Sequence, residues 1–181
     1  MYAHRLFVAA SSLAVTMTMA FPALAQVVST GGEVTGLAQK KIVDRMIVAD
    51  SLEIEMARVA TTQTKNPAVR DLAALLASGH RSHLEALHKL AESPDVGREA
   101  SVDSVTARDV RVLAQLRAMP ADTGFDRAFV TEEVELHQRM IDNLKQWRST
   151  ATNPALQTDI DHTLPILEAH LTRAQAVAAK L

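Results

Sequence analysis

Two histidines stand three residues apart in the segment ASGHRSHLEALH, residues 77–88. If this segment is helical, His80 and His83 lie on the face that also carries Leu76 and Leu87, which should be buried. A titratable ring is a costly substitute for leucine in such a place unless another group satisfies it. Neutral imidazole nitrogen is a good ligand for first-row divalent metals. The spacing therefore suggests a buried metal site.

Other segments place further metal-binding side chain types on apolar faces. Glu133 and His137 are one helical turn apart on such a face, Glu53 lies on an earlier one, and His170 stands at the edge of the last. Candidates from four helices lie within about one turn of the midpoints of those helices, so they should meet in one central layer. The predicted metal ligands are Glu53, His80, His137 and His170, with His83 and Glu133 as candidate additions.

This layer also has a metal-free interpretation. Burying carboxylates and imidazoles is costly unless they satisfy one another. A shared transition-metal ion would satisfy them together, and a Glu–His hydrogen-bonded network would satisfy the same groups without metal. Met46, Met56 and Met140 are interpreted as packing residues rather than copper ligands. The sequence leaves the choice between ion and network open, as well as the identity of any ion.

Helical periodicity covers most of the chain, and Asn-Pro pairs interrupt it. Asn66 and Asn153 are predicted N-caps, with Pro67 and Pro154 at the first helical positions. No segment shows the alternation of a strand over more than a few residues. The predicted helices cover about residues 35–64, 67–91, 105–118, 124–149 and 154 to the C-terminus.

These elements predict an all-α fold, a ferritin-like four-helix bundle. The four long helices have about 25 residues each and would span roughly 37 Å. The connection from residue 92 to 123 contains its own helix and is long enough to run the length of the bundle. We therefore expect the third long helix to start at the same end as the second.

The N-terminus has the layout of a secretory signal peptide over residues 1–25. A short head with one arginine precedes the apolar run LFVAASSLAVTMTMAF, and Ala23 and Ala25 form a cleavage site. The run is short for a membrane span, which disfavours an uncleaved anchor. We expect a flexible segment at 26–34, a bundle domain at 35–181, and no stable membrane span after cleavage. The expected location is the periplasm, with association with the outer membrane as a further option.

Composition excludes several classes of function. The chain has no cysteine, which rules out disulfides, thiolate metal sites and cysteine nucleophiles. Its formal net charge of −2 gives no electrostatic footprint for nucleic acid. A Gly-rich phosphate loop and a Ser-His-Asp context are also missing. The sequence therefore favours a non-enzymatic role and predicts no organic cofactor.

The segments EIEMARVA, NPAVRDLAALLASGHRSH, FDRAFVTEEVELHQRMI and LPILEAHL resemble the exported bacterial family called domain of unknown function 4142. The similarity covers about residues 38–178. Members are often labelled membrane or outer membrane proteins and are assigned a ferritin-like bundle. The resemblance implies an acid on the first helix and a histidine on each of the other three, with Phe-Asp and Leu-Pro motifs before the last two. These positions are Glu53, His80, Phe125, Asp126, His137, Leu164, Pro165 and His170.

The chain departs from the family pattern at two positions. Gly79 stands where the pattern has an acid before the second helix's histidine, and Phe129 replaces a tyrosine. The Glu-x-x-His motifs of ferritin-like di-iron proteins are absent as well, because alanine and leucine stand three residues before His80 and His170. The residues therefore support a single histidine-rich ion with one or two carboxylates rather than a di-iron centre.

Two roles follow from the layer. We expect a metal-binding bundle for storage, buffering or protection under envelope or oxidative stress. The alternative is a non-enzymatic envelope protein whose layer is a metal-free network and which acts through a protein or cell-wall partner. The sequence leaves the oligomeric state open.

Overall fold

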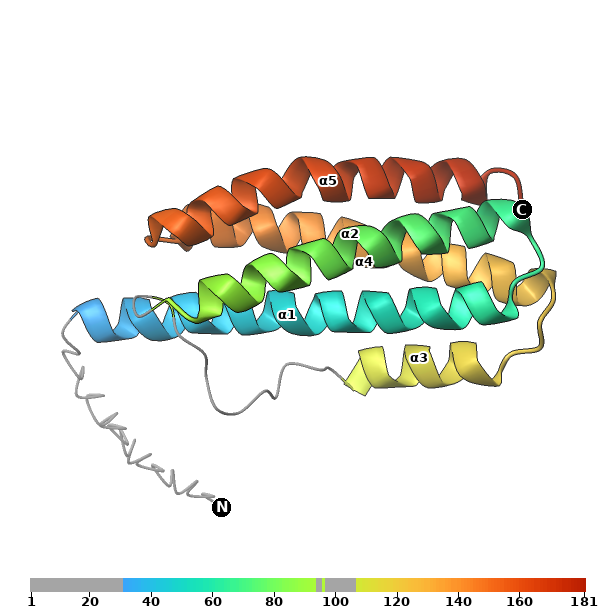
Figure 1. Cartoon of the computed structure of the whole chain (residues 1–181), viewed down its shortest axis with the longest axis horizontal. Coiled ribbons are helices and arrows are strands. Elements are labelled where there is room, and N and C mark those ends of the chain that lie inside the picture. The colour runs from blue at the N-terminus through green and yellow to red at the C-terminus, as the bar shows by residue number, and fades with distance from the viewer. Residues whose placement is uncertain (1–30, 94–95, 97–106) are drawn as a thin grey trace, which may run out of the picture.

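The computed structural model describes residues 31–93, 96 and 107–181, with the backbone alone at 31–38 and 107 (Figure 1). The predicted signal peptide and most of the predicted flexible segment lie outside these residues. Within the described ranges every regular element is a helix, so the chain is all-α. The helices are α1 (Gly31–Gln63), α2 (Pro67–Ala91), α3 (Ala107–Ala118), α4 (Thr123–Thr150) and α5 (Pro154–Ala178).

Side-chain caps set the starts of three helices. Asn66 and Asn153 accept hydrogen bonds from backbone N–H groups two residues later, and Pro67 and Pro154 follow at the first helical position. Both predicted caps are confirmed. Asp122 caps α4 in the same way, with its Oδ1 2.8 Å from the backbone nitrogen two residues on.

The four long helices form two antiparallel pairs, α1 with α2 and α4 with α5. A short turn joins α1 to α2, another joins α4 to α5, and α2 also packs against α5. Figure 1 shows α1 and α5 running from left to right, whereas α2 and α4 run from right to left. Helix α3 packs against α1 and, in Figure 1, runs from left to right, toward the end where α2 began. Helix α4 therefore starts at the same end as α2.

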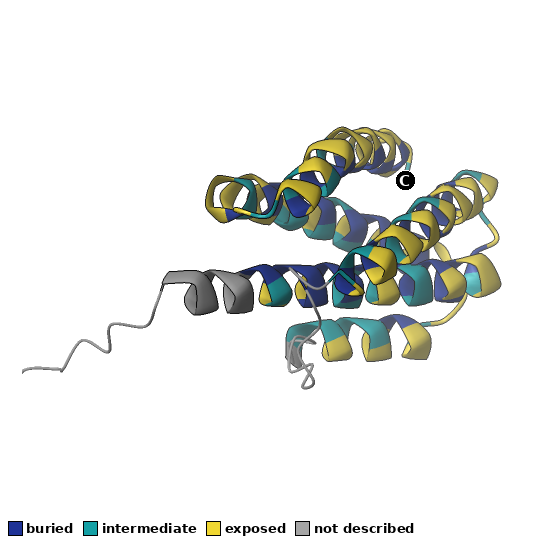
Figure 2. Cartoon of the chain, turned by 60° about the vertical axis from the view of Figure 1, so that its left-hand side comes forward, coloured by how far each residue is buried: buried dark blue, intermediate teal, exposed yellow. Residues whose placement is uncertain are grey.

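The interior consists of two apolar clusters with a polar layer between them. One cluster surrounds Met56, Leu72 and Phe129 near the α1–α2 turn. The other surrounds Met46, Leu87 and Ile160 toward the opposite end. The buried sides of the helices face inward in Figure 2. The buried charged or titratable side chains between the clusters are Asp50, Glu53, His80, Glu133, His137 and His170.

Candidate metal centre

Three imidazoles from three helices form a nearly equilateral triangle in the polar layer. His80 on α2, His137 on α4 and His170 on α5 have ring centroids 5.5, 5.5 and 5.4 Å apart. Each is no more than 5% exposed. Each offers a ring nitrogen, and these nitrogens all lie within 4.8 Å of one another. The triangle can thus hold a metal ion.

Hydrogen bonds at the outer nitrogens orient two of the rings. His80 Nδ1 lies 2.9 Å from Asp50 Oδ1, and His137 Nδ1 lies 2.9 Å from the backbone oxygen of Glu133. A carbonyl and an ionised carboxylate only accept, so both Nδ1 atoms carry the proton. Nε2 of His80 is buried without a hydrogen-bond partner. A carboxylate or carbonyl behind the ring is the arrangement that supports metal-binding histidines in proteins.

The spacing of two ring nitrogens matches what a tetrahedral ion requires. His137 Nε2 lies 3.4 Å from His170 Nδ1. Ligands at about 2.0–2.1 Å from zinc in tetrahedral geometry are about 3.3 Å apart. An ion at this position would therefore replace the contact between the rings with little movement of either.

Gly79 makes room for the third ring. A Cβ at this position would lie 2.7 Å from His170 Cε1 and 3.0 Å from its Nε2. Any side chain at 79 would displace that imidazole. Position 79 carries no acid, and the carboxylate that contacts His80 is that of Asp50 on α1.

Burial disfavours the charged form of all three rings, and their neighbours decide the outcome. Burial prevails for His137, whose pKa is lowered. Burial, together with electrostatic repulsion from the other two histidines when they are protonated, lowers the pKa of His170 to about 4. For His80 the hydrogen bond to Asp50 and the negative charge of Glu53 outweigh burial and raise the pKa. The environment thus favours the neutral, metal-binding form of His137 and His170 and works against it at His80.

Asp50 links the triangle to a second charged group. Its Oδ2 forms an ion pair with His83 Nδ1 at 2.8 Å, and His83 Nε2 lies 3.2 Å from Asp159 Oδ2 and 3.0 Å from Thr163 Oγ1. Burial would lower the pKa of His83, but its bonds to Asp159 and Asp50 raise it to about 9. Burial would also raise the pKa of Asp50, yet its two histidine partners lower it. His83 is thus a cation held between carboxylates, beside the triangle.

A second group of potential ligands adjoins the triangle. Glu53 on α1, Glu133 on α4 and His137 each offer an atom within 4.8 Å of the others. His137 Nδ1 lies 3.9 Å from Glu53 Oε1 and 3.6 Å from Glu133 Oε2. The two groups share only His137.

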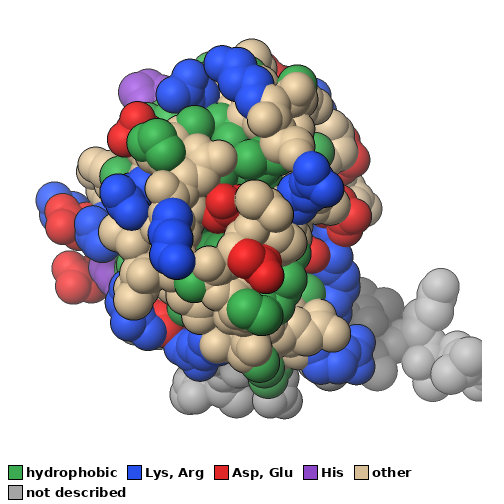
Figure 3. Space-filling view, turned by 90° about the vertical axis from the view of Figure 1, so that its right-hand side faces the viewer, with side chains coloured by type: hydrophobic (Ala, Val, Ile, Leu, Met, Phe, Trp, Pro, Cys, Tyr) green, Lys and Arg blue, Asp and Glu red, His purple; other side chains and the backbone are tan. Residues whose placement is uncertain are grey.

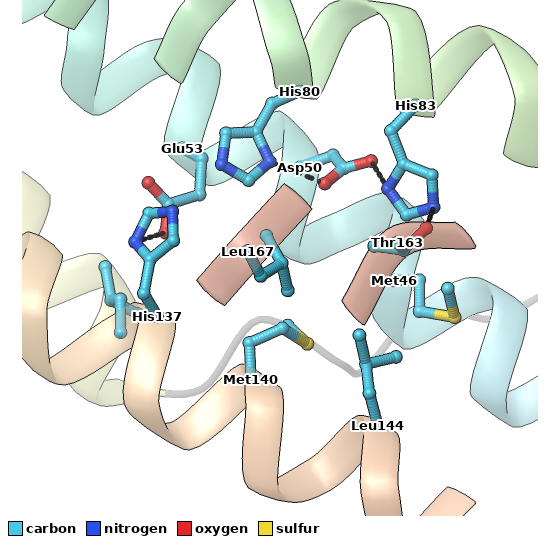
Figure 4. Close-up of a pocket in the computed structure, with 11 residues that line it drawn as sticks. Met46, Asp50, Glu53, His80, His83, His137, Met140, Leu144, Thr163 and Leu167 are labelled. Atoms are coloured by element: carbon cyan, nitrogen blue, oxygen red, sulfur yellow. Dashed lines mark hydrogen bonds and ion pairs between the residues drawn. The ribbon is translucent and has the colours of Figure 1, made fainter. Parts of the chain in front are cut away.

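A cavity of about 30 Å³ lies beside the layer. Figure 4 shows His80 and His83 across this cavity from Met140 and Leu144. A cavity of this size accommodates about one or two water molecules. Its polar wall is Asp50, Glu53, His80, His83 and His137, together with Thr163, and its apolar wall is Met46, Leu136, Met140, Leu144 and Leu167.

The structure brings the predicted metal ligands close together, but they form two groups of potential ligands rather than one. His80, His137 and His170 form one group, whereas Glu53 faces His137 with Glu133 in the other. Sequence analysis missed Asp50 and Asp159. Asp50 stands one turn before Glu53 and so shares its helix face. This spacing could have identified Asp50 as a residue of the polar layer.

Comparison with known proteins places the chain in a family. Searches of curated proteins and of solved structures found no match. The family model described as Domain of unknown function (DUF4142) matches residues 23–177, which include every residue of the layer. The chain therefore belongs to the DUF4142 family.

Proposed function

We propose that the protein binds a transition-metal ion through His80, His137 and His170. The observation that carries this proposal is the unpartnered Nε2 of His80, which is buried beside the rings of His137 and His170 while its Nδ1 is held by Asp50. Imidazole ligands suit zinc, copper, iron and nickel. Glu53, the fourth residue predicted from the sequence, adds negative charge next to this position.

We further propose that this is an exported, ferritin-like bundle that stores, buffers or sequesters metal in the periplasm or at the outer membrane. The signal-peptide pattern of residues 1–25 supports export. The common direction of α2 and α4, with a connection that returns along the molecule, supports ferritin-like connectivity. Protection under envelope or oxidative stress is a role that such binding would serve.

The second candidate function is an envelope protein that acts through a partner and uses the layer only structurally. The chain of contacts from His80 through Asp50 to His83 and Asp159 favours it, because much of the layer is satisfied without an ion. None of the helices in the described ranges is long and apolar enough to cross a membrane.

Metal content separates the two candidates. The untagged mature protein is purified from the periplasm without chelator and measured by elemental mass spectrometry, beside the double variant His80→Leu/His137→Leu. The control is His88→Leu/His162→Leu, which also replaces two helical histidines by leucine, but at exposed positions of α2 and α5. About one zinc, copper, iron or manganese ion per chain in the wild type and the control, and none in the first variant, is expected. Equal metal content in all three proteins, or none in any even after titration, would reject the metal site.

A further inference from the structure

Glu53 and Glu133 form a pair of carboxylates deep in the protein. Glu133 is fully buried and Glu53 is 6% exposed. Neither oxygen of Glu133 has a hydrogen-bond partner, and neither does Oε2 of Glu53. Three carboxylate oxygens are therefore directed into the interior without a donor.

No basic side chain compensates this pair. Among the described residues, the only ion pairs of Glu53 and Glu133 are the long ones to His137, at 3.9 and 3.6 Å. Burial raises the pKa of Glu133 well above its usual value, and both the charge of Glu53 and a hydrogen bond with its side chain when Glu133 is protonated add to the effect. Ionising both carboxyl groups in this buried position is costly without a compensating positive charge. A cation between the two side chains would remove this cost.

We propose that Glu53 and Glu133 hold a second divalent cation, separate from the ion of the histidine triangle. This inference extends the proposed function. It rests on that function only in assuming that a first ion occupies the histidine triangle, which shares His137 with the second site. The imidazole of His137 lies between the two positions, with Nε2 toward His170 and Nδ1 toward the carboxylates. Because Nδ1 donates to the backbone oxygen of Glu133, the two carboxylates are the ligands of the second ion.

The ligand types assign different ions to the two positions. Three imidazoles favour zinc or copper, whereas carboxylates and water suit manganese or magnesium. Such hard cations often keep several waters and use one or two carboxylates. Glu53 and His137 line the 30 Å³ cavity, which offers room for water beside the carboxylates. The second position is the weaker one and fills when Mn²⁺ is added.

The test is a Mn²⁺ titration of full mature protein already loaded with one zinc ion per chain. The six-line electron paramagnetic resonance signal of free Mn²⁺ reports binding, and elemental analysis reports retained zinc. The variants are Glu133→Gln and Glu53→Gln, which keep side-chain shape and remove the charge. The matched control is Glu135→Gln, an exposed glutamate on the same helix. Thermal unfolding checks that each variant is folded.

The wild type and Glu135→Gln should bind one Mn²⁺ per chain and keep zinc. Each of the other variants should keep zinc and lose Mn²⁺ affinity by about 10–100-fold, since one of the two anionic ligands becomes a neutral amide. Failure of the zinc-loaded wild type to bind Mn²⁺ would overturn this inference and leave the histidine site intact. Loss of zinc in Glu133→Gln would also overturn it, because the carboxylates would then belong to one shared ion. Mn²⁺ binding by a protein that cannot take zinc would instead reject the proposed function alone.

Discussion

The nitrogen that each imidazole presents is decided by the partner of its other nitrogen. Asp50 accepts a hydrogen bond from Nδ1 of His80, and the backbone oxygen of Glu133 accepts one from Nδ1 of His137. Helical periodicity predicted that these rings lie on buried faces, because direction on a helix depends only on sequence spacing. It could not predict their partners, because these depend on how far each helix is rotated and which rotamers pack.

A methyl group at position 79 should weaken metal binding. In Gly79→Ala the new Cβ would lie 2.7 Å from His170 Cε1, so the ring must turn away from its partners. We expect zinc affinity, measured by competition with a chromophoric chelator, to fall by on the order of 10–100-fold.

Ser78→Ala is the control for this substitution. Ser78 is exposed and adjacent on α2, so it reports the helix propensity gained with alanine but makes no contact with the layer. Zinc affinity in Ser78→Ala should equal that of the wild type. Unchanged affinity in Gly79→Ala would show that His170 is not a ligand.

The cationic His83 should make stability depend on pH above neutrality. Its pKa rises from 6.5 to about 9 in the folded protein through Asp159 and Asp50. A raised pKa contributes stability that is fully present below about pH 6.5 and is lost as pH rises through about 9. The contribution is on the order of a few kcal/mol.

The check is urea unfolding of metal-free protein between pH 6 and 10, for the wild type and His83→Gln. The free energy of unfolding of the wild type should exceed that of the variant at pH 6, and the difference should shrink toward pH 10. A difference that stays constant across this range would contradict the charged state of His83.

At the scale of elements, a buried clamp ties the α1–α2 turn to the start of α4. Thr64 Oγ1 donates to Asp126 Oδ1 at 2.5 Å and accepts from the backbone N–H of Asn66 at 3.0 Å. Asp126 belongs to the Phe-Asp motif of the family resemblance. Its position shows that this motif residue joins helices rather than contributing to the polar layer.

Thr64→Val should destabilise the protein without changing metal affinity. The substitution keeps the shape but leaves the buried carboxylate of Asp126 without its donor, which costs about 1–3 kcal/mol. Urea unfolding measures this loss, and Thr62→Val, at an exposed position two residues earlier, should lose much less. Equal losses in the two variants would mean that the clamp contributes nothing beyond local helix effects.

The helix boundaries were largely predictable, because N-caps and helix breaks depend on residues that are adjacent in the sequence. The Asn-Pro starts of α2 and α5 were predicted to the residue. The aspartate cap of α4 was not, since Asp122 stands in a segment that reads only as a helix break. The shared direction of α2 and α4 was an expectation from connection length, and its realisation depends on packing along the whole molecule.

At the scale of the whole molecule, the described residues form no other surface that indicates a function. Large exposed apolar side chains are scattered singly over α2, α3 and α5, at Leu75, Val110 and Ile166. On the end of the molecule shown in Figure 3, basic and acidic side chains are interspersed around apolar ones. Chemistry that the described residues support is thus concentrated in the interior layer.

The layer divides the hydrophobic interior, and this determines how metal should affect stability. Apolar clusters on both sides bury their side chains fully, whereas the layer between them retains unpartnered polar atoms. These atoms lower the stability of the metal-free protein. An ion that binds only the folded chain would stabilise it by mass action, by about 2.7 kcal/mol at a concentration 100 times its Kd.

Zinc should therefore raise the melting temperature of the mature protein by about 5–10 °C, since 1 kcal/mol corresponds to about 2–4 °C at this size. Differential scanning calorimetry of chelator-treated protein, with and without zinc, measures the shift. His80→Leu/His137→Leu should lose most of this shift, and its metal-free form should melt below the metal-free wild type, because the buried Oδ1 of Asp50 loses the donor that His80 supplies. The same zinc-induced shift in this variant would place the stabilising ion outside the histidine triangle.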